Sequence, residues 1–233
     1  MPARLEIKIN SHNPVTPKGA HAITHELLRS EEDLGKTLHD SQNSLTFPSW
    51  KNLRDHSVLR VASPDDTIIR MMRLGLIENE IYVGNEKAQL ISATTISRMS
   101  WEELLSPQPC KELRLEFTTP TSFKSQGEML ALPVPQLILQ SALRITAPWT
   151  SAKYAELQAG CESVRLGMAQ INTELVEING MNAFPGFTGQ IKLQATDSKG
   201  EQLLGFLHNV SEFVHIGAKG AYGLGHCITQ RLH

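Results

Sequence analysis

Alternating polar and apolar residues predict short strands in the first half of the chain. The segment Arg4–Ile9 switches between polar and apolar at every position, which is the two-residue period of a half-buried strand. Short apolar runs at 58–61, 81–83 and 88–91 are typical of further strands. Four strands are therefore expected before the middle of the chain.

Helical spacing separates these strands. Apolar residues recur every three or four positions from about Gly19 to Arg29, and Leu34 and Leu38 continue the pattern. Asp65 is a typical N-cap residue for a second helix that extends to about Leu74. We interpret the order of elements as β-α-β-β-α-β, which is the ferredoxin-like arrangement.

The same order begins again after the segment 106–109, because Pro107 and Pro109 cannot continue a helix or a central strand. The elements predicted in the second half are strands at 113–117, 187–195 and 226–232 and helices at 136–146, 152–168 and 201–210. We therefore predict an α+β protein of two tandem ferredoxin-like βαββαβ domains, at 1–105 and 110–233.

A glycine-rich loop precedes the last predicted strand. Four glycines fall within nine positions, and they are Gly217, Gly220, Gly223 and Gly225. A phosphate loop of the Walker type needs Gly-Lys-Ser/Thr at the start of a helix, and a dinucleotide fingerprint lies between a strand and a helix. This loop leads into a strand instead, so neither kind of nucleotide site is predicted. The glycines indicate a loop that packs against, or cradles, another group.

Length and composition place the chain among ordinary globular proteins. Its 233 residues fit two domains, since one domain commonly has about 100–150 residues. No apolar run reaches the length of about 18 residues that a bilayer span requires. The residues after Met1 lack the apolar core of a signal peptide. We expect a cytoplasmic protein with no membrane partner.

Cysteine usage and net charge add little about function. Cys110, Cys161 and Cys227 are odd in number and far apart, which favours buried or inert reduced thiols and offers no Cys-x-x-Cys pair for zinc or redox chemistry. The formal net charge is −2. Because net charge does not locate charge, it neither supports nor excludes a basic face that binds nucleic acid.

Three segments, in order along the chain, carry a resemblance to a known family. The stretch 115–123, Leu-Glu-Phe-Thr-Thr-Pro-Thr-Ser-Phe, is followed by Leu-Pro-Val-Pro at 132–135 and a predicted helix. This run resembles the "SPT-x-F … LPDP … SL" pattern of the CRISPR repeat-RNA endoribonucleases, the Cas six family. The stretch 33–40 with Phe-Pro-Ser at 47–49 resembles that family's "LA-x-x-LH-x … F-x-x-S" pattern. The glycine-rich C-terminus looks like that of the wider RAMP superfamily.

This resemblance implies a fold and an activity. It implies two ferredoxin-like domains and an endoribonuclease that cuts CRISPR precursor RNA within each repeat, without a metal or another cofactor. The implied partners are the repeat hairpin, the mature crRNA and other subunits of the interference complex. Two other hypotheses stay open, which are a cleavage-inactive RNA-binding RAMP subunit and an unrelated globular protein whose glycine loop only packs.

The resemblance also implies catalytic histidines. His39, in the Leu-His pair, is the expected helper of 2′-hydroxyl attack on the neighbouring phosphate, which gives a 2′,3′-cyclic phosphate and a 5′-hydroxyl. A pKa of about 6.5 suits imidazole to proton transfer near neutral pH. His25 is the expected partner acid, although its alignment needs a one-residue gap. The alternatives are a capping or surface role for His39 and a helix-surface role for His25.

A metal site and a third catalytic group are less well indicated. His21 and His25 are four residues apart and share a helix face, but no third ligand has a fixed spacing, so no metal is predicted. Family members often carry a lysine shortly after the Leu-His pair, and the stretch 40–46 has none. Lys51 or Arg54 is a candidate substitute, and Ser44 is a candidate donor to a phosphate oxygen.

Further residues are predicted to bind RNA. Lys124 is expected in a hairpin whose turn includes 125–127, and relatives use such a hairpin on the RNA duplex. In the glycine loop, Lys219 is expected to bind a phosphate while the amides of Gly220 and Gly223 point into the same concavity. The alternatives are a solvated turn lysine at 124, and Gly217, Gly223 and Gly225 that only pack the loop.

Overall fold

The computed structural model describes residues 1–29, 45–151, 153–178 and 182–232. The chain divides into two compact units. The first unit is Met1–Met99 together with Gly220–Gly223, and the second is Ser100–Lys219 together with Leu224–His233. The division between the units falls ahead of the predicted linker at 106–109, and a short segment of the glycine-rich loop belongs to the first unit.

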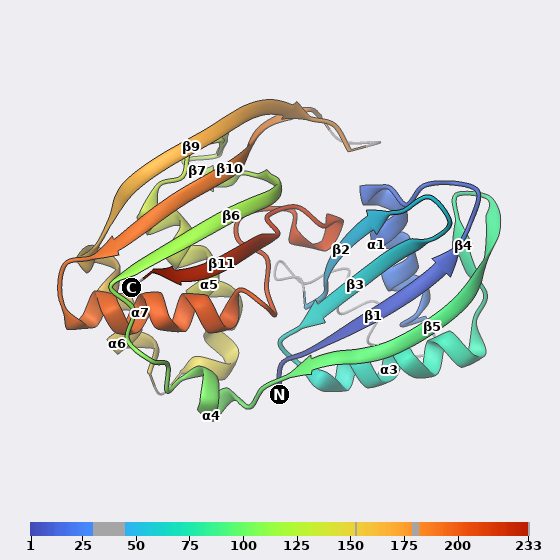
Figure 1. The fold of residues 1–233 in the computed structure, drawn as a ribbon, viewed down its shortest axis with the longest axis horizontal. Coiled ribbons are helices and arrows are strands. Elements are labelled where there is room, and N and C mark those ends of the chain that lie inside the picture. The colour runs from blue at the N-terminus through green and yellow to red at the C-terminus, as the bar shows by residue number, and fades with distance from the viewer. Residues whose placement is uncertain (30–44, 152, 179–181, 233) are drawn as a thin grey trace. The chain divides into compact units, whose positions relative to one another are not determined.

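In the part of the first unit that the structure describes, a five-stranded antiparallel sheet packs with the helices α1 and α3 (Figure 1). Its elements are β1 (Ala3–Asn10), α1 (Pro17–Glu26), β2 (Phe47–Asn52), β3 (Ser57–Ser63), α3 (Asp66–Glu78), β4 (Ile81–Val83) and β5 (Glu86–Arg98). The sheet order is β2-β3-β1-β5-β4. The four strands β2, β3, β1 and β5 have the ferredoxin-like order, and β4 adds a short edge hairpin with β5.

The core of the first unit follows the alternation of β1. Leu5, Ile7 and Ile9 are fully buried, because they all point to the sheet face that the helices cover. Ile69 and Met72 of α3 belong to the same cluster. The Asp65 side chain accepts a hydrogen bond from Thr67 N at 3.0 Å, so the predicted N-cap is confirmed.

Several boundaries in the first unit differ from the prediction. The helix predicted to reach Arg29 ends at Glu26, and α3 continues to Glu78 rather than Leu74. The strand predicted at 88–91 extends over the whole of β5. No strand was predicted at β2, which supplies the strand that the β-α-β-β-α-β order requires. His39 and Ser44 lie outside the described residues, so their predicted roles stay predictions.

The second unit repeats this architecture with a four-stranded antiparallel sheet (Figure 1). Its elements are α4 (Trp101–Leu104), β6 (Glu112–Thr121), β7 (Phe123–Ser125), β8 (Glu128–Leu130), α5 (Pro135–Thr150), α6 (Tyr154–Ala159), a 3₁₀ turn η1 (Gly160–Ser163), β9 (Val164–Val176), β10 (Phe184–Ala195), α7 (Ser198–Val210) and β11 (Cys227–Leu232). The order β11-β6-β10-β9 is ferredoxin-like, and β7 pairs with β8 alone. The predicted fold class is confirmed.

Large aromatic side chains form the core of the second unit. Phe117, Phe187, Phe206 and Phe213 are all fully buried. The rings of Phe117 and Phe187 meet edge to face with centroids 5.0 Å apart. Full burial of such a side chain contributes about 1.5–3 kcal/mol, so residues from β6, β10 and α7 hold the sheet and helix together.

The helix predicted at 152–168 is wrong. Among the described residues of this range, α6 and η1 alone are helical, and Val164 begins the strand β9. The backbone of β9 pairs with β10 in antiparallel register, for example Met168 with Lys192. Most β9 side chains are exposed, so no burial period marks the strand in the sequence, and sheet pairing outweighs the local helical pattern.

The three cysteines are free and buried, as predicted. Burial raises the pKa of the Cys227 thiol to about 12, so this group stays protonated near neutral pH. Among the helices in the described ranges, none has both the length and the apolar character needed to cross a membrane.

Candidate functional site

His21 and His25 lie on one face of α1. The helix begins with Thr16 as N-cap, whose side chain accepts from Gly19 N at 3.1 Å, and Pro17 holds the first helical position. Ala20, Ile23 and Thr24 turn inward, which leaves His21 and His25 half-buried at the side. Their ring centroids are 4.3 Å apart with an interplanar angle of 67°, as expected of neighbours at i and i+4.

The tip of the glycine-rich loop, Gly220–Gly223, packs on this face within the first unit. The carbonyl oxygen of Ala221 lies 3.2 Å from His21 Nδ1. The ring of Tyr222 stacks on the His21 ring, with centroids 4.2 Å apart and planes 28° apart. Residues separated by 200 positions in the sequence therefore meet in one cluster. We call His21, His25, Ala221 and Tyr222 the histidine cluster.

Gly223 fixes the loop tip against β2. It has a positive φ of +80°, and a Cβ there would lie 2.1 Å from the Trp50 ring and 2.8 Å from the Pro48 carbonyl oxygen. Its amide donates to the Gly220 carbonyl at 2.9 Å, which closes the 3₁₀ turn η2 (Gly220–Tyr222). The prediction that the Gly223 amide points into a concavity is therefore wrong, because its N–H already donates to the Gly220 carbonyl within the turn.

The other two positive-φ glycines of the loop pack within the second unit. Gly217 has φ +104° and donates to Ser141 Oγ at 2.7 Å, and Gly225 has φ +74° and donates to the Pro120 carbonyl at 3.1 Å. A Cβ on Gly225 would lie 2.0 Å from the Ile216 carbonyl oxygen. Gly217 and Gly225 thus pack the loop within the second unit, and RNA contact by Gly217, Gly220 or Gly225 stays a prediction.

Lys219 lies at the edge of a cavity in the second unit. The cavity has a volume of about 310 Å³ and is lined by Met129, Asn182, Ala183, Phe184 and Lys219. Lys219 is exposed and has φ +63°, a left-handed conformation that is uncommon for a residue other than glycine. An exposed ammonium beside this cavity suits contact with a phosphate. The RNA contact of Lys219 stays a prediction.

Lys124 occupies the predicted hairpin. It lies in β7 opposite Met129 of β8, and the turn residues Gln126 and Gly127 both have positive φ, at 51° and 88°. Two positive values at the turn centre match the type I′ turn, which suits the twist of a two-stranded hairpin. The Lys124 side chain is exposed. The hairpin is confirmed, and its RNA contact stays a prediction.

Lys51 lies at the end of β2 on the sheet face that points away from the helices. It pairs with Val58, which in turn pairs with Lys8, so the two lysines share one cross-strand row. In the next row Arg60 donates to Glu6 at 2.9 Å. Lys51 is exposed, which leaves it accessible to a phosphate group.

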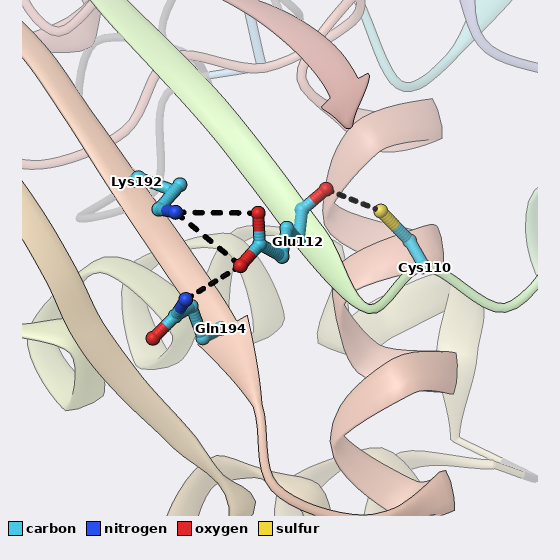
Figure 2. Close-up of polar contacts among 4 residues, drawn as sticks. All are labelled: Cys110, Glu112, Lys192 and Gln194. Atoms are coloured by element: carbon cyan, nitrogen blue, oxygen red, sulfur yellow. Dashed lines mark hydrogen bonds and ion pairs between the residues drawn. The ribbon is translucent and has the colours of Figure 1, made fainter. Parts of the chain in front are cut away.

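The corresponding sheet face of the second unit carries a polar cluster instead of a stacking surface. Figure 2 shows the Glu112 carboxylate between Lys192 Nζ, at 3.3 Å, and Gln194 Nε2, at 2.5 Å. These donors, Gln194 foremost, hold the pKa of Glu112 below its ordinary value. Cys110 Sγ donates to the Glu112 backbone carbonyl at 3.0 Å (Figure 2). The charge of Lys192 is thus partly balanced.

Aromatic stacking is absent from the described part of this face. The residues of β6 and β10 that share it, by their cross-strand register, are Glu112, Arg114, Glu116, Gln190, Lys192 and Gln194. Sheets that bind single-stranded RNA commonly stack bases on aromatic side chains. These residues of β6 and β10 provide charged and amide groups, which suit phosphate and sugar contacts.

Sequence reasoning missed three members of the histidine cluster. It treated His21 only as a possible metal ligand and gave Ala221 and Tyr222 no role. Within the described ranges, no three His, Cys, Asp or Glu side chains gather in a way that could hold a metal ion. The available signal was an aromatic residue inside a glycine-rich run, but nothing in the sequence places that run beside α1.

Comparisons with known proteins relate the chain to one family. A sequence model of the family described as CRISPR-associated endoribonuclease Cas6 matches residues 115–227. A CRISPR-associated endoribonuclease Cas6 of Mycobacterium tuberculosis is 29% identical over 135 residues, which are 52% of this chain and 40% of the relative. The chain thus matches well under half the length of this curated relative.

Solved structures share the fold over the whole chain. A Cas6 product complex has a TM-score of 0.86 at 23% identity and covers 99% of this chain and 100% of its own. A second Cas6 product complex has a TM-score of 0.85 at 18% identity, covering 98% and 99%. A Thermus thermophilus Cas6 has a TM-score of 0.75 at 23% identity, covering 99% and 98%. At these identities the likeness shows the fold.

Proposed function

Because the chain is similar to Cas6 proteins in sequence and in fold, we propose that it belongs to this family and is an endoribonuclease that cleaves CRISPR precursor RNA within the repeats. The observation that carries the proposal is the family match across 115–227, which extends from β6 to the first residue of β11. The shared two-domain fold supports it. The chain keeps the 3′ hairpin of its product and acts as a subunit of the interference complex.

The proposed reaction is an internal transfer on the RNA backbone. The 2′-oxygen forms a bond to the adjacent phosphorus as the bond from phosphorus to the 5′-oxygen breaks. One group accepts the 2′-hydroxyl proton and another donates a proton to the departing 5′-oxygen, so the products are a 2′,3′-cyclic phosphate and a 5′-hydroxyl. No metal is required, because imidazole groups carry both proton transfers.

Two histidines take these roles in the proposal. His39, by the family resemblance, assists attack of the 2′-hydroxyl, and His25 is its partner acid. The geometry of α1 supports a role for His25, since its half-buried ring is in contact with a second imidazole. Well-positioned acid–base groups of this kind contribute roughly 10²–10⁴ in rate.

Exposed lysines supply the proposed RNA contacts. Lys51 of the first unit and Lys124 and Lys219 of the second are all exposed. Lysine binds phosphate as a point charge and positions the RNA without reading its sequence. A-form RNA has a deep and narrow major groove, so we expect recognition of the hairpin by its shape, its phosphates and the flanking single strand.

A cleavage-inactive RNA-binding subunit is the second candidate function. The observation that favours it is the absence of lysine from 40–46, where relatives place a group that steadies the phosphate charge. Such a protein would bind the repeat hairpin and leave it intact.

Incubation with its own repeat RNA distinguishes these functions. We expect cleavage at one position in excess EDTA, with a cyclic phosphate on the 5′ fragment. A single 2′-deoxy nucleotide just 5′ of the scissile phosphate is expected to abolish cleavage, because the attacking oxygen is absent. Tight binding without cleavage would support the inactive subunit, and cleavage of the deoxy substrate would exclude the proposed mechanism.

A further inference from the structure

The His21 ring is held from the side of the glycine-rich loop by two contacts. The Ala221 carbonyl oxygen lies 3.2 Å from Nδ1, and the Tyr222 ring stacks on the imidazole at 4.2 Å. Both residues belong to the segment Gly220–Gly223, which is part of the first unit. One neighbour is a carbonyl oxygen at a ring nitrogen and the other is an aromatic face, so together they restrain the rotation of His21.

The carbonyl contact also selects a protonation form of His21. A carbonyl oxygen only accepts hydrogen bonds, so Nδ1 must carry the proton when this bond is made. In the neutral ring, Nε2 is then the nitrogen with the lone pair. The backbone of the loop tip therefore favours the Nδ1–H tautomer, in the way that a hydrogen-bond partner on one ring nitrogen sets the role of the other.

The His21 ring in turn restricts the orientation of His25. The two rings meet at 4.3 Å with planes 67° apart, which is the edge-to-face arrangement that aromatic rings prefer. A rotation of the His21 side chain would either break this ring contact or bring the two rings into steric overlap. His25 lies in the last turn of α1, so the His21 ring is a lateral support for it.

The loop tip is itself rigid enough to act as a support. Its 3₁₀ turn is closed by the bond from Gly223 N to Gly220 O, and Gly223 lies against Trp50 of β2 at a distance that excludes a Cβ. Trp50 in turn packs against the hydrophobic core of the first unit. The position of Tyr222 is thus fixed to the same sheet that α1 covers.

We propose that Tyr222 is a positioning residue for RNA cleavage and that His21 is the side chain through which it acts. The loop tip holds His21 as the Nδ1–H tautomer, and the His21 ring orients His25 for proton transfer. This inference rests on the proposed function, and it extends that function by coupling the C-terminal glycine-rich loop to the proton-transfer groups of the first unit.

The test compares Tyr222→Ala with Tyr222→Phe. Tyr222→Ala removes the stacked ring and is expected to lower the single-turnover cleavage rate of repeat RNA at least about tenfold, since small misplacements of reacting groups cost up to about 10². RNA affinity should stay the same. Tyr222→Phe keeps the ring and should recover most of the lost rate. Tyr82→Ala removes an exposed tyrosine of β4 and serves as the matched control.

A spectroscopic measurement separates positioning from general stability. Ring-nitrogen NMR of ¹⁵N-labelled protein without RNA reports the tautomer of His21, with His21→Gln used to assign the signals. We expect a dominant Nδ1–H form in the wild type and in Tyr222→Phe, and a mixture in Tyr222→Ala. If Tyr222→Ala unfolds, Tyr222→Leu takes its place in both measurements.

The outcomes also separate this inference from the proposed function. A wild-type protein that leaves repeat RNA intact would refute the function, while the tautomer measurement would still decide the coupling between the loop and His21. Wild-type cleavage with an unchanged rate in Tyr222→Ala would overturn the inference alone. An unchanged His21 tautomer in Tyr222→Ala would overturn it as well, even if the rate fell.

Discussion

His25 differs from an ordinary surface histidine in its surroundings. Its ring lies edge-on to another imidazole at 4.3 Å and is half-buried, so its orientation is restricted before any substrate arrives. Pre-organised acid–base groups are effective because no reorganisation is needed during the reaction. Substitution of His25 by alanine therefore tests the role of the ring directly, since it removes the ring without disturbing a core position.

We expect His25→Ala and His39→Ala each to lower single-turnover cleavage by roughly 10² or more, because each removes a proton-transfer group. The affinity for the repeat hairpin should hardly change. Rates and dissociation constants measured on the same RNA check this expectation, with His12→Ala, an exposed histidine of the first unit, as the control. Equal loss of binding would indicate a structural role, and wild-type cleavage would remove that histidine from the site.

Lys219 differs from the two histidines, because its charged side chain is exposed and its backbone is in the left-handed region. If Lys219 contacts a phosphate, Lys219→Ala should weaken RNA binding and reduce the salt slope of log affinity by about 0.7–0.9. Stability should stay within about 0.5 kcal/mol. Lys111→Ala, also exposed in the second unit, is the control. An unchanged slope in Lys219→Ala would exclude the phosphate contact.

Among the elements, the glycine-rich loop places two constraints on the same residue. Gly223 has a positive φ and also leaves no room for a Cβ beside Trp50. Gly127, in the β7–β8 turn, has a positive φ of +88° with open space around it. A comparison of substitutions at Gly223 and Gly127 therefore distinguishes the cost of backbone strain from the cost of a steric clash.

Gly223→Ala should destabilise the protein more than Gly127→Ala. Both substitutions impose an unfavourable φ that costs about 1–3 kcal/mol, but only the first forces a methyl group into Trp50 and the Pro48 carbonyl. Urea unfolding of the two variants measures the difference. Equal destabilisation would mean that the loop tip moves away from β2 at little cost, which would also weaken the argument that it supports His21.

The strands that sequence reasoning missed have a common physical cause. Both β2 and β9 lie at the edge of a sheet. The last two residues of β2 are exposed and the strand contains Pro48, while β9 is exposed along nearly its whole length. Central strands such as β1 bury every second residue and are therefore visible as a period of two. Edge strands are defined by pairing with a neighbour, which no local pattern records.

At the scale of the whole molecule, the predicted architecture was more secure than the predicted site. The repeated order of strands and helices and the family resemblance both lead to two ferredoxin-like units, and the observed strand orders agree. The histidine cluster was not predictable in the same way. The contact between His21 and Ala221 joins residues 200 positions apart, and it depends on a four-residue segment of the C-terminal loop that belongs to the first unit.

The fold also predicts a stability change at high pH. Burial raises the pKa of Cys227 from its ordinary 9.0 to about 12, so the unfolded chain releases this thiol proton at a lower pH than the folded chain does. The stability that the protonated thiol contributes is therefore complete below about pH 9 and is lost as pH rises toward about 12. Cys227 begins β11 and pairs with Phe117 of the core, which is why solvent does not reach it.

Urea unfolding between pH 8 and 11 tests this account by comparing slopes rather than absolute stabilities. Cys227→Ala leaves a small cavity and should be less stable than the wild type at pH 8. Its stability should nevertheless fall less steeply than that of the wild type above about pH 9, because one thiol no longer titrates differently in the two states. Lysine and tyrosine titration is common to both proteins and cancels in the comparison. Parallel curves for the two proteins would show that the Cys227 thiol does not couple pH to folding, and that β11 opens readily enough for the thiolate to form in the native state.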